Sequence, residues 1–250
     1  MISVNVLDDI STLQVCQIVK NNYPKQHSSN IMKKMYEKLR CYFLSVFCCS
    51  ILISCATKPA VKNEWVYDKG IVIFSLNNGE CLITLRGDIT PALVRPLAEA
   101  VEMTTSNKCT SKWIQLDSIG GSVGAAMSIG ELLRLKQFNT SIIKSVCASS
   151  CGLIFTAGVK RAISAPSSIF ITSYLEFHQI SYNDGDFKVC KEDLASPVWR
   201  GIRGYLNKML PTNASNHFYN SMWLTDCTKT LQLDSNQAIL YGIATQTTRD

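Results

Sequence analysis

Three short segments hold residue types that suit acyl-transfer chemistry, and the first is a glycine turn. Gly120 and Gly121 stand in the segment from Asp117 to Val123, between a predicted strand and a predicted helix. Two glycines allow a sharp turn that leaves backbone N–H groups free at a helix N-terminus, where they can bind the oxyanion of an acyl-transfer intermediate. By itself a Gly-Gly turn is more often only a turn. It is not a phosphate-binding loop, because the Lys-Ser/Thr element is absent.

The second segment, Cys147-Ala-Ser149-Ser150-Cys151-Gly152, also joins a predicted strand to a predicted helix. A serine at such a junction exposes its hydroxyl at the edge of the sheet, and the N–H that follows can point at the same oxyanion. The segment is not the Gly-x-Ser-x-Gly elbow. Taken alone, Ser149 fits a helix N-cap better than a nucleophile.

The third segment is Phe177-His178-Gln179, which follows an apolar, strand-like stretch. The chain has three histidines; His27 lies in the N-terminal region, and His217 stands in a polar helix start that solvent can reach. A single histidine is usually structural, but His178 could be the base that a serine nucleophile requires.

The elements that must position these segments alternate between strand and helix patterns. Strands are predicted over 70–76, 81–85, 113–116, 141–146, 162–164 and 169–172, with a hairpin turn at 77–79. Helices are predicted over 90–105, 122–136 and 149–158, and near 192–209, 213–223 and 235–241. This alternation predicts an α/β fold with much parallel pairing.

In this order, the three segments resemble those of the Clp protease proteolytic subunit and the wider Clp/crotonase superfamily, most of all the exported Clp-like proteins of bacteria. There a Gly-Gly turn supplies the oxyanion hole, an Ala-Ser turn carries the nucleophile and a His-Gln stretch carries the base. Connecting stretches at 157–161, 165–166 and 238–244 match as well, so the resemblance covers about 70–245. It implies an α/β spiral of β-β-α units with a mostly parallel sheet.

The resemblance also implies roles for individual residues. Ser149 would attack a peptide carbonyl and His178 would take its proton, while the N–H groups of Gly121 and Ser150 would hold the oxyanion. Counting back from the Ala-Gly pair at 157–158 favours Ser149 as nucleophile, with Ser150 as the fallback.

Two departures from the family pattern concern the base and its orienting acid. His178 comes about four residues late, and a surface bulge over 172–176 would accommodate the extra residues. Aligning Gly242 puts Thr230 where the family has an aspartate. Asp226 is our candidate to orient His178, and Asp117, beside the glycine turn, is a weaker alternative.

Composition fits a globular chain from an oxidising compartment. The 250 residues are 46% hydrophobic and 18% charged, which excludes a disordered tail, a collagen or a coiled-coil rod. The formal net charge is +6, yet no basic stripe with interleaved aromatic residues appears, so no nucleic-acid partner is expected. Eleven cysteines point to an oxidising compartment.

Six cysteines follow Cys55, and their even number suggests disulfides whose connectivity the sequence leaves open. The pairings that we favour are Cys81–Cys109, Cys147–Cys151 and Cys190–Cys227. A metal or redox role for the pair around Ser149 is disfavoured, because Cys-x-x-x-Cys is not the redox motif and no His/Cys cluster stands beside it. No metal and no cofactor are predicted.

The first fifty-five residues are interpreted as a targeting segment. A basic cluster at 33–40 precedes an apolar run over 41–54, which is shorter than the roughly 20 residues of a membrane-spanning helix and suits a signal peptide. Leu52-Ile-Ser-Cys55 resembles the lipobox of bacterial lipoproteins, in which the cysteine is acylated after cleavage. A short transmembrane or buried helix is the alternative. Because 1–31 does not fit a signal peptide, we expect translation to start at Met32.

These expectations divide the chain into an untranslated 1–31, a signal peptide over 32–54, an acylated Cys55 with a tether to 69, and a serine hydrolase domain over 70–250. The predicted protein is an outer-membrane lipoprotein that faces the periplasm and hydrolyses peptide bonds without ATP. Its predicted partners are a peptide or protein substrate, the membrane through its lipid anchor, and further copies of itself. The alternative is an inactive Clp-like domain that binds peptides or acts as a scaffold. An acyl-CoA enzyme fits export poorly.

Overall fold

The computed structural model describes residues 61–164, 174–184, 187–190 and 194–247. The chain divides into two compact units, Met1–Thr57 and Lys58–Asp250, and the described residues all belong to the second. The predicted signal peptide and Cys55 therefore lie outside the described residues, as does the strand predicted over 169–172. Within the described ranges, no helix is both long enough and apolar enough to cross a membrane.

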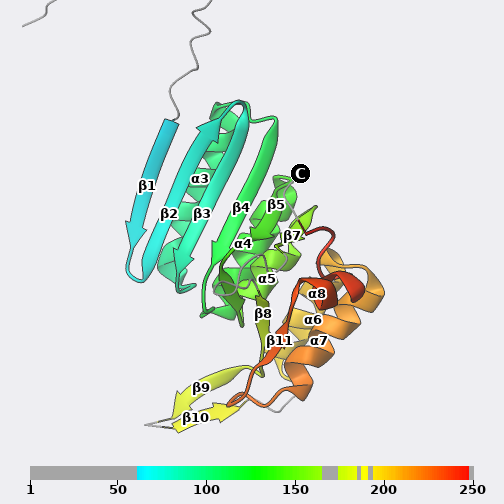
Figure 1. Cartoon of the computed structure of the whole chain (residues 1–250). Helices are drawn as coiled ribbons and strands as arrows, with labels where there is room; N and C mark the ends of the chain where they lie inside the picture. The colour runs from blue at the N-terminus through cyan, green and yellow to red at the C-terminus, as the bar shows by residue number, and fades with distance from the viewer. Residues whose placement is uncertain (1–60, 165–173, 185–186, 191–193, 248–250) are drawn as a thin grey trace, which may run out of the picture. The chain divides into compact units, whose positions relative to one another are not determined.

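A six-stranded sheet forms the first layer, in the order β1-β2-β3-β4-β5-β7 (Figure 1). Its first three strands pair antiparallel, and β3, β4, β5 and β7 pair parallel. The strand bounds are Val61–Tyr67, Gly70–Asn77, Glu80–Gly87, Ser111–Asp117, Asn139–Ile142 and Arg161–Ile163. The predicted hairpin is present, with Asn78 and Gly79 at positive φ between β2 and β3. The predicted α/β class with parallel pairing is confirmed.

Strand β1 corrects the expected tether, which was drawn through residue 69. Val61–Tyr67 pairs with β2 over its whole length. Trp65 and Tyr67 face the core, while Lys62, Glu64 and Val66 are exposed. This period-two alternation is the mark of a half-buried strand, and the polar residues between the aromatic ones hid it.

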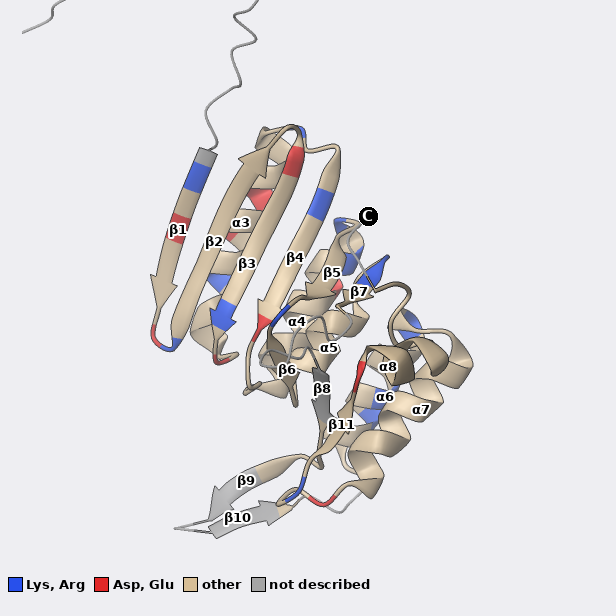
Figure 2. Ribbon diagram, in the orientation of Figure 1, with Lys and Arg blue, Asp and Glu red and all other residues tan. Residues whose placement is uncertain are grey.

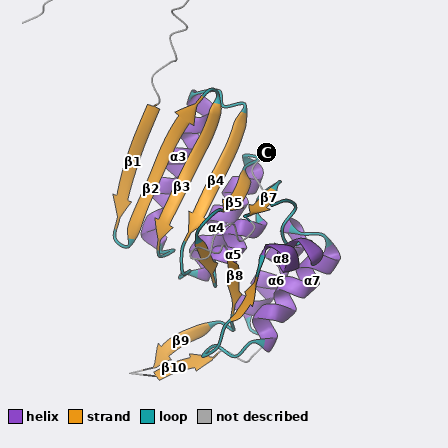
Figure 3. Cartoon of the chain, in the orientation of Figure 1, coloured by secondary structure: helices purple, strands orange, loops and turns teal. Residues whose placement is uncertain are grey.

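Helices cover one face of this sheet (Figure 3). The bounds are η1 Pro91–Leu93, α3 Val94–Ser106, α4 Val123–Leu135 and α5 Cys151–Thr156. Helix α3 packs on β1, β2 and β3, and α4 packs between α3 and α5. These contacts bury one continuous apolar core that includes Phe74, Ile83, Leu97, Leu133 and Phe155. The three helices were predicted at these places.

A second, three-stranded sheet carries the third segment. Its order is β11-β8-β6, with bounds Val146–Ala148 for β6, Tyr174–Phe177 for β8 and Leu231–Leu233 for β11. Strand β8 pairs parallel with β6 and antiparallel with β11. Residues 174–176 are therefore strand, and the expected surface bulge there is wrong. The single strand predicted over 141–146 is likewise two strands, because the chain leaves the large sheet after Ile142 and enters the small one at Val146.

The hairpin of β9, Ser181–Asp184, and β10, Phe187–Cys190, follows directly and leads to the C-terminal helices. These are α6 Pro197–Met209, α7 Thr212–Leu224 and α8 Ser235–Leu240, beside α5 and β11 in Figure 1. Phe177 of β8 meets Phe218 of α7 edge to face, with ring centroids 4.7 Å apart. This contact joins the small sheet to the helices behind it.

Two arginines, Arg134 of α4 and Arg161 of β7, bind carbonyls of the C-terminal part. Arg134 donates to the carbonyls of Thr156, Ala157 and Met209. Arg161 donates to the carbonyls of Gly242 and Ile243. Burial, and secondarily Arg134, lowers the pKa of Arg161 to about 10, so Arg161 stays charged at neutral pH.

All three predicted disulfides are present. Their Cα atoms lie 5.7 Å apart in Cys81–Cys109, 5.2 Å in Cys147–Cys151 and 5.4 Å in Cys190–Cys227.

The charged residues are scattered, with both signs along β1, β3 and β4 (Figure 2).

Candidate active site

The glycine turn lies between β4 and α4 and is held against the chain that leaves β3. Ile89 N–H donates to the Gly120 carbonyl at 2.8 Å, and Ser122 N–H donates to the Ile89 carbonyl at 2.7 Å. Gly120 and Gly121 have φ of 100° and 141°. A Cβ on Gly121 would lie 2.3 Å from the Ile89 oxygen, and one on Gly120 would lie 2.8 Å from Ser149 Cβ. Only glycine fits this turn, because it touches two other backbones closely.

Two N–H groups of this region have no acceptor among the residues that the structure describes. Gly120 N–H donates to Ser118 Oγ at 3.1 Å. Within the described part of the chain, nothing accepts the N–H of Gly121 or of Ser150. Both residues line the same cavity, so these two donors can serve an anion there.

The serine segment forms a strained elbow between β6 and α5. Ser149 has φ of +54°, the left-handed region that L-residues other than Asn and Asp rarely occupy. The strand before it is fixed by Ser118, whose N–H donates to Val146 O and whose carbonyl accepts from Ala148 N–H, both at 2.9 Å. The Cys147–Cys151 disulfide closes the elbow around Ser149 and Ser150. Ser149 is partly exposed, whereas Ser150 is buried.

His178 follows β8 at the same edge of the small sheet. Ala148 is the β6 partner of Glu176, so Ser149 and His178 each lie just beyond the paired residues. Ser149 and His178 line the same cavity. His178 Nδ1 lies 2.5 Å from the Gln179 carbonyl oxygen. A carbonyl only accepts, so Nδ1 donates, and the neutral ring carries its lone pair on Nε2.

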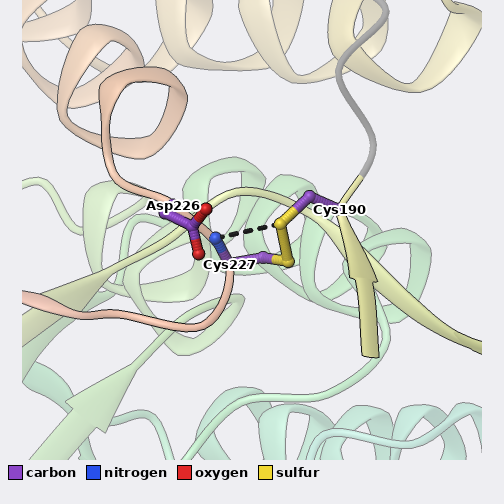
Figure 4. Close-up of side chains that lie close together, drawn as sticks. All are labelled: Cys190, Asp226 and Cys227. Atoms are coloured by element: carbon purple, nitrogen blue, oxygen red, sulfur yellow. Dashed lines mark hydrogen bonds between the residues drawn. A yellow bond between two sulfur atoms is a disulfide. The ribbon is translucent and has the colours of Figure 1, made fainter. Parts of the chain in front are cut away.

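Asp226, the predicted orienter, does not line the cavity. It is exposed, and its Oδ1 accepts from Thr228 N–H at 2.7 Å and from Thr228 Oγ1 at 2.5 Å. It lies beside the Cys190–Cys227 disulfide, where Cys227 N–H donates to Cys190 Sγ at 3.2 Å (Figure 4). Because both thiols are consumed by the disulfide, this cluster offers no thiolate to a metal.

The loop 226–230 nevertheless flanks His178. Gln179 N–H donates to the Thr225 carbonyl at 2.9 Å, and Phe177 is the β11 partner of Leu231. The two ends of the loop are thus fixed on either side of His178. Continuing the β11 register by one residue puts Thr230 opposite His178, which agrees with the sequence alignment on Gly242.

Asp117, the weaker alternative, points elsewhere. Its carboxylate pairs with Arg86 at 3.8 Å and accepts from Val146 N–H at 3.5 Å. It therefore supports the start of β6 and does not line the cavity.

The cavity has a volume of about 530 Å³ and brings the three segments together. Gly120, Gly121, Ser149, Ser150 and His178 line it. Ile119 and Val123 of the predicted glycine segment also line it, whereas the sequence analysis missed Asp88, Ile180, Ser181 and Met222. No sequence signal marks Asp88, because the contact of the next residue, Ile89, with the glycine turn is a tertiary one.

Comparison with known proteins bears on the fold and not on the chemistry of the cavity. No protein-family model and no curated protein matches the chain. A solved structure does match: a serine-to-alanine mutant of the 1510-N membrane-bound stomatin-specific protease, at 15% sequence identity and a TM-score of 0.52. The match covers 67% of this chain and 78% of that one. The chain therefore shares the fold of this protease.

Proposed function

We propose that the chain is an envelope lipoprotein with a Clp-like serine peptidase domain, in which Ser149 is the nucleophile and His178 is the base. The conformation of Ser149 carries this proposal. A left-handed serine costs about 1–3 kcal/mol, and such strain clusters at functional sites. Here the strained serine shares a cavity with a histidine and with two N–H groups that have no acceptor within the described part of the chain.

The proposed reaction follows the roles of these groups. His178 Nε2 takes the proton of Ser149 Oγ as Oγ bonds to the substrate carbonyl carbon. The N–H groups of Gly121 and Ser150 receive the oxyanion, a contact of the kind whose loss costs about 10²–10³ in turnover. His178 then gives its proton to the departing amine, and water releases the acyl group by the same steps.

Asp226 is the proposed orienter of His178, although its carboxylate is bonded to Thr228. Both ends of the loop 226–230 are bound next to His178. A conformational change within this loop would let the Asp226 carboxylate leave Thr228 and accept a hydrogen bond from the His178 ring. The Gln179 carbonyl meanwhile holds the tautomer that a base requires.

A second candidate function is peptide binding without hydrolysis. The observation in its favour is Thr230, which the β11 register puts opposite His178 where the resemblance expects an aspartate. A triad without its aspartate can lose about 10⁴ in turnover.

A fluorophosphonate probe distinguishes these functions, because it reacts with activated serines. The purified protein would be treated beside its Ser149→Ala and Ser150→Ala variants. Labelling that disappears in Ser149→Ala and persists in Ser150→Ala is the expected result. A folded wild-type protein that stays unlabelled would favour the binding function.

The proposed anchor is an acyl group on Cys55, and further copies of the chain are proposed partners. The pairing of all six later cysteines supports an oxidising compartment such as the periplasm. Cys55→Ser is expected to release the protein from the membrane fraction. Unchanged fractionation of this variant would instead indicate a membrane-spanning segment.

A further inference from the structure

Among the described residues that line the cavity, Asp88 alone carries a carboxylate. It is partly buried. In the described part of the chain, no lysine or arginine forms an ion pair with it, whereas Asp117 and Glu99 each pair with an arginine. A carboxylate that is partly shielded from water and has no cationic partner is available to form an ion pair with a cationic ligand.

The backbone of Asp88 is fixed relative to the glycine turn. Its N–H donates to the Lys69 carbonyl at 3.1 Å, and its carbonyl accepts from the Tyr67 hydroxyl at 2.8 Å. The next residue, Ile89, makes both hydrogen bonds to the turn. Asp88 is thus held on the same rigid backbone as the proposed oxyanion donors, as a specificity residue should be.

The charge of Asp88 also acts on its surroundings. Burial raises the pKa of Tyr67 to about 12, and the carboxylates of Asp88 and Asp68 add to this effect.

Apolar side chains accompany this carboxylate in the cavity. Ile119, Val123, Ile180 and Met222 share the lining with Asp88. Ile119 is 69% exposed, so its apolar surface is open to a ligand. A carboxylate among aliphatic groups suits a long side chain with an apolar stem and a cationic end.

We propose that this cavity selects a lysine or arginine side chain of the substrate, with Asp88 as the residue that determines the specificity. The inference rests on the proposed function for the substrate being a peptide. The stem of the substrate side chain packs on the aliphatic lining, and its ammonium or guanidinium group pairs with the Asp88 carboxylate.

The test measures binding alone, so it does not depend on catalysis. The protein with Ser149→Ala would be titrated with pairs of hexapeptide amides, otherwise alanine, that carry either lysine or norleucine at one position, for each position in turn. Amide chemical shifts report the dissociation constants. At one position or more, the lysine peptide is expected to bind about 10-fold more tightly, which corresponds to about 1.4 kcal/mol.

Further variants separate the carboxylate from its surroundings. Adding Asp88→Asn should abolish the preference while norleucine peptides bind as before, and Asp88→Lys should create a preference for glutamate peptides. Glu99→Gln is the matched control, because it removes the same charge from an exposed site on α3, and it should keep the lysine preference. The preference should weaken with added salt.

Three results would overturn the inference: equal binding of all pairs, a preference that survives Asp88→Asn, or no measurable binding at millimolar peptide. Fluorophosphonate labelling of the protein that retains Ser149 tests the proposed function separately. Labelling without a lysine preference leaves the peptidase and removes this specificity. A lysine preference without labelling leaves a cation-selective peptide-binding site and removes the peptidase.

Discussion

Removing the Cys147–Cys151 disulfide is expected to cost much activity and little stability. The bridge closes a loop with a sequence separation of 4, so the chain-entropy model gives it a contribution of only about 2 kcal/mol. Part of that loss would return, because Ser149 could then leave its positive φ and release about 1–3 kcal/mol of strain. The two terms nearly cancel, so the double variant Cys147→Ala/Cys151→Ala should unfold at almost the wild-type urea concentration.

The activity of this double variant, in contrast to its stability, should fall strongly. Relaxation of the elbow would move the Ser149 hydroxyl away from His178 and from the two N–H donors, and a displacement of about 1 Å can cost roughly 10² in rate. The rate of fluorophosphonate labelling is the measure.

The Cys81–Cys109 disulfide supplies the matched control. Its separation of 28 corresponds to about 3.6 kcal/mol in the same model, and neither cysteine lines the cavity. The variant Cys81→Ala/Cys109→Ala should lose stability and keep the labelling rate of its folded fraction. The reasoning is refuted if removal of the Cys147–Cys151 bridge leaves labelling unchanged, or if both variants lose labelling in proportion to stability.

Three further predictions concern the cavity and the C-terminal helices. Gly121→Ala should destabilise the protein by at least about 1–3 kcal/mol in urea unfolding, and slow labelling, because its Cβ would lie 2.3 Å from the Ile89 oxygen at a φ of 141°. Ser150→Ala should raise the unfolding free energy by about 1 kcal/mol, since its buried Oγ has no partner among the described residues; a loss would reveal a missed hydrogen bond. Burial lowers the pKa of His217, which stacks on Tyr241, so the unfolded chain binds more protons and stability should fall as the pH drops below about 6.5. His217→Gln should flatten that fall between pH 7 and pH 5, and an unchanged slope would contradict this origin.

Much of the fold could be predicted because its signals are local. The Asn78-Gly79 turn, the apolar strands on either side of it and the helix after Pro91 follow from turn chemistry and periodicity over a few residues. Strand β1 was missed because half of its side chains are polar and exposed, and β11 because its three residues find a partner only in β8, far away in the sequence. Such pairing is a tertiary event that a local pattern cannot contain.

The residues of the candidate site also differ in whether local sequence signals or tertiary contacts position them. Ser149, His178 and Gly121 stand at strand ends, and the sequence indicates strand ends well. The strain at Ser149 depends on Ser118 and on a disulfide, and the position of Asp88 depends on Lys69 and Tyr67, so neither could be foreseen from neighbouring residues. The orienter of His178 was the weakest prediction, because a loop of five residues allows Asp226 and Thr230 very different directions.

The hydrogen bonds of Arg161 have a consequence for the edge of the large sheet. Arg161 reaches the carbonyls of Gly242 and Ile243, and its own carbonyl accepts from Thr245 N–H at 2.8 Å. These partners lie more than eighty residues after Arg161 in the sequence. In a chain cut before Gly242, the Arg161 guanidinium would keep only the Gly158 carbonyl as an acceptor among the described residues. The C-terminal segment therefore secures the edge strand of the large sheet, although none of its residues lines the cavity.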